Sequence, residues 1–379
     1  MPEGSLIFPA AEYRRRIAAL QHEMSNSSLG ALLLTTPADV FNTGLLSRFW
    51  ESPARPWFIV VPAAGDPVAV IPSTGADLMR RCWIRDIPTW NAPNPVDDGV
   101  SLLADTLVSL LPPRGNIGIP MGLKTYLRMP VADFMRLQDC IAPRKITDGT
   151  EAVLRGARSN PKPRSTRSGP PAPSPMPPLR TQECRCRKSF AIFRSPSCKK
   201  GPTGSAMLRA GRGGYGVVIS PADDRSLQRG DVLMLDTGAV RDGYFCDFDR
   251  NFSIGPADDD VRRAQAALFT ATKTALSTLR PGILACDLHR LITQSLTRHG
   301  AVAGGGRLDH GLGIALTEWP SVTPLGTTEL REGMVPTLEP GVEIARGHML
   351  VHEENIVLRA QGPELLSRRA PAEMPQITG

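Results

Sequence analysis

The stretch GDVLMLDTGAVRDGYFCDFDR, Gly230–Arg250, decides the fold of the region around it. Its apolar run Val232–Leu235 is typical of a buried strand. The pair Asp242-Gly243 is a hairpin-turn signal, because glycine supplies the positive φ that tight turns need. The segment Tyr244–Ile254 is therefore predicted to return as the second strand of a hairpin.

Three aspartates on this hairpin indicate a bound cation. Asp247 and Asp249 lie two residues apart, so their side chains point to the same face of the strand. Asp236, on the first strand, is expected to lie opposite one of them, depending on the register. Carboxylates that face each other repel, and burying them is costly unless a cation neutralises them. This pattern predicts a divalent metal site with oxygen ligands.

Length and composition are those of an ordinary globular protein. The 379 residues allow two or three domains and a sizeable core. The first residues contain no apolar run of signal-peptide length, and no stretch reaches the roughly 18 apolar residues of a membrane helix. We therefore expect a cytoplasmic protein with no membrane partner. The seven cysteines include no CxxC pairs, so reduced thiols are expected.

The net charge of +7 comes from one segment. Residues 157–212 hold 13 Lys and Arg against a single acid, Glu183, a net charge of +12, so the rest of the chain carries −5. A basic balance confined to one segment does not mark the whole surface as a nucleic-acid binder, and we expect no nucleic-acid partner.

Residues 1–148 are predicted to form an α/β domain. Helices are expected at Ala11–Met24 and Ser101–Leu111, with buried strands near 31–36, 57–61 and 68–71. Trp50 and Trp57 flank a Pro-rich loop. Core packing is the favoured interpretation for both, and the alternative is that they line a pocket or a subunit contact.

The segment 157–211 interrupts this pattern. It contains ten prolines and the basic run CRCRKSF, and it has almost no helical or strand periodicity. A disordered insertion, a basic partner site and a translated frameshift are the three explanations. The abrupt change of composition at both ends favours the frameshift. Cys184, Cys186 and Cys198 have no accompanying histidine, and their spacing fits no standard zinc site.

Beyond the hairpin, helices are expected at Asp258–Leu279 and from about Leu288 to Gly300, followed by strands near 335–338 and 349–358. A short internal echo links the two parts. Leu227-Gln-Arg-Gly-Asp-Val232 leads to Asp236, and Leu330-Arg-Glu-Gly-Met-Val335 leads to Glu339, each acid six residues after the glycine. A second acid follows each: Asp247 in one case, Glu353 or Glu354 in the other. The echo suggests two halves that contribute acids to one centre.

The candidate metal ligands are one histidine and four acids: Asp236, Asp247, His310, Glu339 and Glu354. Such a set suits a pair of divalent ions such as Mn, Fe, Co or Zn. Two ions close together lower the pKa of a shared water and polarise a substrate carbonyl.

The order Asp-x10-Asp … His … Glu … Glu occurs here in DTGAVRDGYFCDFDR, HGLGIALTEWPS, TLEPG and VHEENIV. It resembles the pita-bread metallohydrolases, which include methionine aminopeptidase, Xaa-Pro aminopeptidase, prolidase and creatinase. The resemblance covers about 213–372, and residues 1–148 resemble the creatinase-type N-terminal domain of prolidase-like members. It implies an α+β pita-bread domain with a pseudo-twofold repeat at 149–379, and a homodimer. It also implies that Asp236, Asp247, His310, Glu339 and Glu354 are ligands, with Asp247 and Glu354 bridging, whereas Asp249 occupies a position that is often Thr.

The chain departs from the peptidases of this family at two histidines. One is expected upstream of the first aspartate, where residues 214–225 read GYGVVISPADDR and contain none. The other is replaced by Thr317. Both would donate hydrogen bonds to substrate or to the tetrahedral intermediate. Asp309 also differs, since glycine is usual before this histidine, and an acid there would adjust the imidazole or crowd the site.

Three functions follow as hypotheses. The leading one is a dinuclear Xaa-Pro peptidase-like hydrolase that attacks an amide bond of a small molecule or short peptide with metal-bound hydroxide, with Glu339 or Glu318 as proton shuttle. The second is a lyase or hydrolase of a small zwitterion, like dimethylsulfoniopropionate lyases, ectoine hydrolases or creatinases, with Trp50 and Trp57 holding a cationic group. The third is an inactive binding relative.

Overall fold

The computed structural model describes residues 9–38, 56–92, 94, 96–123, 125–158, 227–241, 244–304, 306–345 and 348–377. Trp50, the turn at Asp242-Gly243 and residues 159–226 lie outside the described residues. The predictions for the basic, Pro-rich segment 157–211 and for the upstream histidine position concern residues that lie almost entirely in this range.

The chain divides into two compact units, Met1–Asn160 and Pro161–Gly379. The sequence had placed the boundary at 148. The structure assigns α6 (Thr150–Arg158) to the first unit, because Ala152 and Val153 pack in the same core as α1 (Ala10–Asn26).

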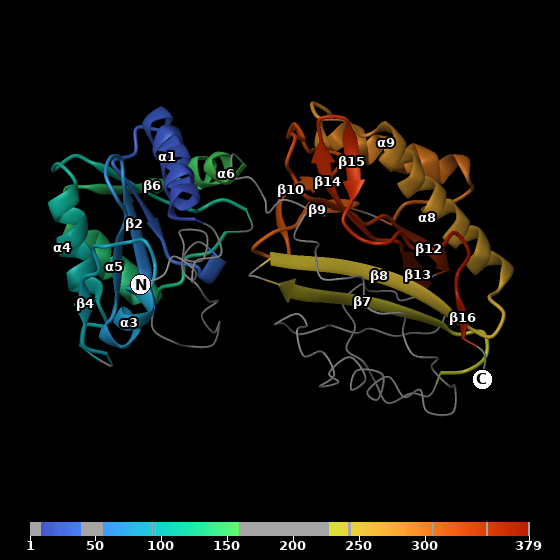
Figure 1. Ribbon diagram of the computed structural model, residues 1–379, viewed down its shortest axis with the longest axis horizontal. Helices are drawn as coiled ribbons and strands as arrows, with labels where there is room; N and C mark the ends of the chain where they lie inside the picture. Colours follow the sequence, from blue (N-terminus) through green and yellow to red (C-terminus); the bar gives the residue numbers. More distant parts are fainter. Residues whose placement is uncertain are drawn as a thin grey trace. The chain divides into compact units, whose positions relative to one another are not determined.

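The first unit is built on one six-stranded mixed sheet of order β4-β3-β2-β1-β5-β6 (Figure 1). Its strands are β1 (Ala31–Leu34), β2 (Phe58–Pro62), β3 (Val68–Pro72), β4 (Thr89–Trp90), β5 (Asn116–Ile119) and β6 (Lys145–Asp148). Its other elements are α1, α6, α4 (Val100–Leu110), α5 (Val131–Ile141), the 3-10 turn η2 (Ser73–Gly75) and α3 (Ala76–Met79). The α/β domain expected from the sequence is thus present.

Alternation along the central strands explains the layers of this unit. Leu32 and Leu34 pack in the core shared with α1, whereas Ala31 and Leu33 pack in the core shared with α4 and α5. A sheet covered on both faces needs strands that are apolar throughout, as these are. Trp57 belongs to the first core, is 4% exposed and presses its ring against Gly75. This placement contradicts a role for Trp57 in holding a cationic ligand.

The second unit contains the predicted hairpin and a larger sheet. The strands β7 (Val232–Arg241) and β8 (Tyr244–Ile254) pair antiparallel, and β16 (Gln376–Ile377) joins β8. A five-stranded sheet has the order β10-β9-β11-β14-β15. Its strands are β9 (Asp309–Gly311), β10 (Glu318–Val322), β11 (Pro336–Leu338), β14 (Glu354–Arg359) and β15 (Gly362–Leu365). A separate pair is formed by β12 (Gly341–Ala345) and β13 (His348–Val351).

Two helices, α8 (Asp259–Thr278) and α9 (Ala285–Arg298), cover one face of the five-stranded sheet (Figure 1). Leu338, Ile356 and Leu358 point into the core that these helices share with the sheet. Because side chains alternate along a strand, Thr337 and Asn355 point to the opposite face. That face, directed toward β8, carries the polar side chains of the site.

The sequence echo has a structural counterpart. The N–H of Gly230 bonds to the carbonyl of Ile254 (2.8 Å), and the N–H of Ile254 returns to Asp231 (2.8 Å). The N–H of Gly333 bonds to Leu358 (2.7 Å), and that of Leu358 returns to Met334 (2.8 Å). Both glycines have positive φ, +89° and +85°, a conformation that side chains disfavour. The repeated turn fits the expected pseudo-twofold arrangement.

Within the described residues, none of the helices combines the length and apolar character needed to cross a bilayer.

Candidate metal centre

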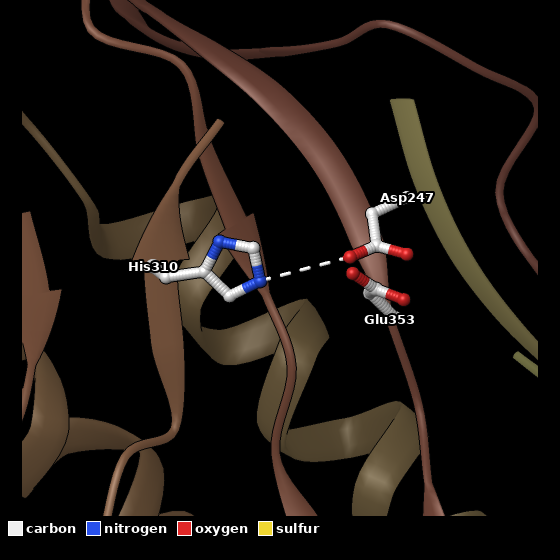
Figure 2. A group of neighbouring side chains, drawn as sticks. All are labelled: Asp247, His310 and Glu353. Atoms are coloured by element: carbon white, nitrogen blue, oxygen red, sulfur yellow. Dashed lines mark ion pairs between the residues drawn. The ribbon is translucent and has the colours of Figure 1, made fainter. Parts of the chain in front are cut away.

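Strand alternation brings three buried side chains from distant parts of the second unit together. Asp247 comes from β8, His310 from the middle of β9, and Glu353 from the residue before β14. Their ligand atoms all lie within 4.8 Å of one another. Figure 2 shows the imidazole facing the two carboxylates, with His310 Nε2 at 3.7 Å from Asp247 Oδ2. These side chains converge although Asp247 and Glu353 are 106 positions apart in the sequence.

Glu339 lies at the edge of this group. Its Oε2 is 3.6 Å from His310 Nε2 and 3.4 Å from a guanidinium nitrogen of Arg307. The side chain retains 18% exposure, whereas that of His310 retains 2%. Solvent can therefore reach Glu339, whereas His310 is closed off from it.

Two hydrogen bonds orient the members of the group. His310 Nδ1 lies 2.9 Å from the carbonyl of Gly311, which makes Nδ1 the donor and directs Nε2 toward the acids. The hydroxyl of Thr337 donates to Glu353 Oε1 (2.7 Å) and fixes that carboxylate. Such outer partners set the direction of metal-ligating atoms.

Negative charges crowd the buried acids of this region. Burial, and then the charges of Asp247 and Glu339, raise the pKa of Glu353 well above its usual value. Burial, and then Asp236 and Glu339, raise the pKa of Asp249 in the same way, only partly opposed by Arg250. In addition, the buried Oδ1 of Asp249 has no hydrogen-bond partner among the described residues. A divalent cation would relieve each of these costs, so the residues present fit a metal.

The hairpin register, which the sequence left open, is now defined. Asp236 pairs directly with Asp249, and Gly238 pairs with Asp247. All three aspartates consequently point to one face, as expected. Asp236 and Asp249 lie outside the 4.8 Å group, on the same side of the ribbon.

Comparison with known proteins agrees with this geometry. Residues 202–360 match the model of metallopeptidase family M24. The matched residues lie in the second unit, which carries the group described above. A match to a metallopeptidase family agrees with the divalent metal use that the sequence predicted.

Two relatives and one solved structure illustrate the similarity. An Xaa-Pro dipeptidase of Pyrococcus horikoshii is 30% identical over 148 residues, 39% of this chain and 42% of its own length. The alignment therefore spans less than half of that relative. A probable dipeptidase PepE of Mycobacterium tuberculosis is 26% identical over 98% of both chains. The crystal structure of dipeptidase PepE from Mycobacterium ulcerans superposes with a TM-score of 0.76, covering 98% of this chain and 100% of that one at 22% identity. The two-domain, prolidase-like pita-bread fold expected from the sequence is confirmed.

One expected ligand, Glu354, is not part of the group. Its Oε1 accepts from the N–H of Ala370 (2.8 Å) and lies 3.3 Å from His352 Nε2. Its Oε2 accepts from Arg250 (3.3 Å). Glu354 shares the helix-facing side of β14 with Ile356 and Leu358, so it points away from Asp247. Glu353 takes the place that the sequence analysis gave to Glu354.

A second expected residue, Glu318, stabilises a loop. Its Oε1 accepts from the N–H of Ala315 (2.9 Å), and its carboxylate packs against Gly313, where a Cβ would come within 2.5 Å of Oε2. The carbonyl of Gly313 in turn accepts from the N–H of Phe245 (2.7 Å), at the start of β8. These contacts give Glu318 a structural role in holding the loop, and its part in proton transfer stays a prediction.

Asp309 does not crowd the imidazole. It pairs with Leu338 and Val322 and therefore points to the helix-facing side, opposite to His310. It is fully buried, and burial, followed by the charge of Glu339, raises its pKa well above the usual value. The second unit thus keeps a buried acid on the opposite side of β9 from His310.

The choice between Glu353 and Glu354 had a signal in the sequence. In VHEENIVL, Ile356 and Leu358 share the parity of Glu354, and Asn355 shares that of Glu353. Since the apolar side of a strand next to helices faces the core, Glu354 belongs to the core side.

Proposed function

We propose that this chain is a metal-dependent hydrolase that cleaves Xaa-Pro dipeptides or related small amides. The observation that carries the proposal is the buried group of Asp247, His310 and Glu353 within 4.8 Å in a metallopeptidase-family domain. The dipeptidase names of the two relatives described above support the substrate class.

We assign the metal-holding role to Asp247, His310, Glu339 and Glu353, with Asp236 completing a site for two ions. A set rich in carboxylates with a single imidazole suits Mn, Fe, Co or Zn, and manganese is our first choice because carboxylates favour hard ions. When bound, such ions lower the pKa of a shared water and polarise the substrate carbonyl.

The protein side chains then have distinct tasks. His310 offers Nε2, held in place by the contact of Nδ1 with the carbonyl of Gly311. Glu339, the partly exposed member, accepts a proton from water at Oε2 and returns it to the nitrogen of the leaving amine. The balance is one water consumed, one C–N bond broken, and one carboxylate and one amine released. Arg307 contacts the same oxygen, Glu339 Oε2, at 3.4 Å.

A lyase or hydrolase of a small zwitterion is the alternative, and Thr317 is the observation behind it. A threonine in place of a histidine removes one donor that would stabilise a tetrahedral intermediate. The dipeptidase-named relatives favour peptide hydrolysis over this alternative, and the assembled donor group argues against an inactive binding relative.

One experiment separates these functions. The full-length protein is stripped of metal, reloaded with Mn²⁺, and assayed on an Xaa-Pro dipeptide, on a dipeptide without proline, and on sulfonium and ectoine-type zwitterions. Cleavage of the first, lost in His310→Ala, is the expected result. Turnover of a zwitterion alone would support the alternative, and no Mn²⁺ binding would overturn the proposal. Homodimerisation and a cytoplasmic location stay predictions, and light scattering tests the first.

A further inference from the structure

The amide of Asn355 makes two hydrogen bonds with the backbone of one residue of the metal centre. The N–H of Asp247 donates to Asn355 Oδ1 (3.2 Å), and Asn355 Nδ2 donates to the carbonyl of Asp247. Asn355 is 1% exposed and Asp247 8%. An asparagine side chain offers a donor and an acceptor in one plane, so it pairs with a backbone peptide as a neighbouring strand would.

This pairing joins two sheets that share no ladder. The strand β8 belongs to the sheet β16-β8-β7, and β14 belongs to β10-β9-β11-β14-β15. Asp247 is therefore on a different sheet from His310 and Glu353. The separation between them depends on what holds β8 against β14 at this point.

Asn355 also belongs to the row of side chains that carries the rest of the group. Thr337 pairs with His310 on one side and with Asn355 on the other. The hydroxyl of Thr337 binds Glu353, which shares the face of Asn355. One row across β9, β11 and β14 thus carries His310, then Thr337, which binds Glu353, and then Asn355, which binds the backbone of Asp247.

We propose that Asn355 is a positioning residue that sets Asp247 at ligand distance from His310 and Glu353. It acts through the backbone of Asp247. Without the amide, the buried N–H and carbonyl of Asp247 lose these partners, and the carboxylate loses its fixed position. Loss of an outer partner of this kind weakens metal binding about 10–100-fold. The inference rests on the proposed metal-holding role of Asp247.

The chain provides a matched control in Asn251. It lies on the same strand as Asp247, is 7% exposed, and its Nδ2 donates to the carbonyl of Val351 (2.6 Å). It therefore also ties β8 to the opposite segment with a buried amide. Its partner is not a member of the metal group, so its loss reports the structural cost alone.

The test compares Asn355→Leu with Asn251→Leu in the full-length, metal-stripped protein. Leucine keeps the approximate shape of asparagine and removes both polar atoms. Mn²⁺ affinity is measured by calorimetry and folding stability by urea unfolding. We expect both variants to lose stability, and only Asn355→Leu to bind Mn²⁺ about 10–100-fold more weakly. Asn355→Thr, which retains one hydrogen-bonding group, should fall between wild type and Asn355→Leu, and it serves if the leucine variant does not fold.

Equal Mn²⁺ affinity in the wild type and the Asn355 variants would overturn the inference and leave the proposed function intact. Equal weakening in the Asn251 variant would overturn it too, because the effect would then be general loosening of β8. Absence of Mn²⁺ binding by the wild-type protein would overturn the proposed function, and this inference with it.

Discussion

Two adjacent buried glutamates, Glu353 just before β14 and Glu354 at its start, are in opposite situations. Glu353 is surrounded by the negative charges of Asp247 and Glu339 and receives one hydrogen bond, from the neutral Thr337. Glu354 lies against Arg250 and His352 and accepts the N–H of Ala370. The protein itself compensates the second carboxylate, whereas the first lies among like charges that a bound cation or a proton would neutralise. Burial alone therefore does not distinguish a functional acid from a structural one, but the charges around it do.

The largest effect expected from this contrast is on metal binding. Glu353→Gln removes a proposed ligand, so Mn²⁺ affinity should fall by more than the about 100-fold that losing an outer partner costs. Glu354→Gln should lower affinity far less, since its side chain points to the helices. Calorimetric titration of both metal-stripped variants provides the comparison. Equal losses would show that the two faces are not functionally distinct.

The free energy of unfolding should rank the two variants in the opposite order, with Glu354→Gln losing more than Glu353→Gln. Glu354→Gln loses charge-assisted hydrogen bonds and should cost about 2 kcal/mol of unfolding free energy. Glu353→Gln removes a buried charge among like charges, so the metal-free protein should become no less stable. Urea unfolding without metal measures both. A destabilised Glu353→Gln protein would mean that this face is already neutralised.

The pH dependence of the metal-free protein should sharpen the same point. The folded-state pKa values of Glu353 and Asp249 are raised, whereas the unfolded values are about 4.3 and 3.9. At pH values between the unfolded pKa and the higher folded pKa of each group, the folded protein binds more protons than the unfolded chain. The free energy of unfolding therefore falls as pH rises through this window. Each group contributes at most about 1.4 kcal/mol per pH unit.

Urea midpoints between pH 4 and pH 8 check this expectation, with Glu353→Gln as the control, which should show a shallower fall. Excess Mn²⁺ should flatten the curve of the wild type near neutral pH. If wild type and variant gave the same slope without metal, Glu353 would not titrate in this range.

The smallest expected effect concerns Thr337. Thr337→Val keeps the volume and removes the hydrogen bond to Glu353, so Mn²⁺ binding should weaken by about 1 kcal/mol, roughly fivefold. Thr337→Ser retains the hydroxyl and should bind as the wild type does. A strong loss in the serine variant would assign the effect to packing of the methyl group instead.

Much of the fold was accessible from local patterns. The apolar runs that became β1, β2 and β3, the hairpin β7–β8, and the helices α1, α4, α8 and α9 all had clear periodicity or turn signals. The strands β5 and β6 and the helices α5 and α6 were not anticipated. Lys145–Asp148 is largely polar and has little strand character, so its place at the sheet edge depends on pairing with β5.

The sequence predicted a group of acids with one histidine. The structure brings Asp247, His310 and Glu339 of that prediction together, and Asp236 lies on the same face of the hairpin as Asp247. Glu354 lies outside that group. The order of residues in a motif does not distinguish two adjacent glutamates, whereas a strand directs the side chains of neighbouring residues to opposite faces. The roles of Asn355 and Thr337 depend on two sheets meeting, which no local pattern encodes.

The most direct test of the central claim is an anomalous-difference map from crystals of the full-length protein grown with Mn²⁺, recorded on both sides of the manganese absorption edge. The account predicts a peak bounded by the carboxylates of Asp247 and Glu353 and by Nε2 of His310, with Glu354 still bound to Arg250. A peak coordinated by Glu354, or no peak within reach of His310, would contradict it.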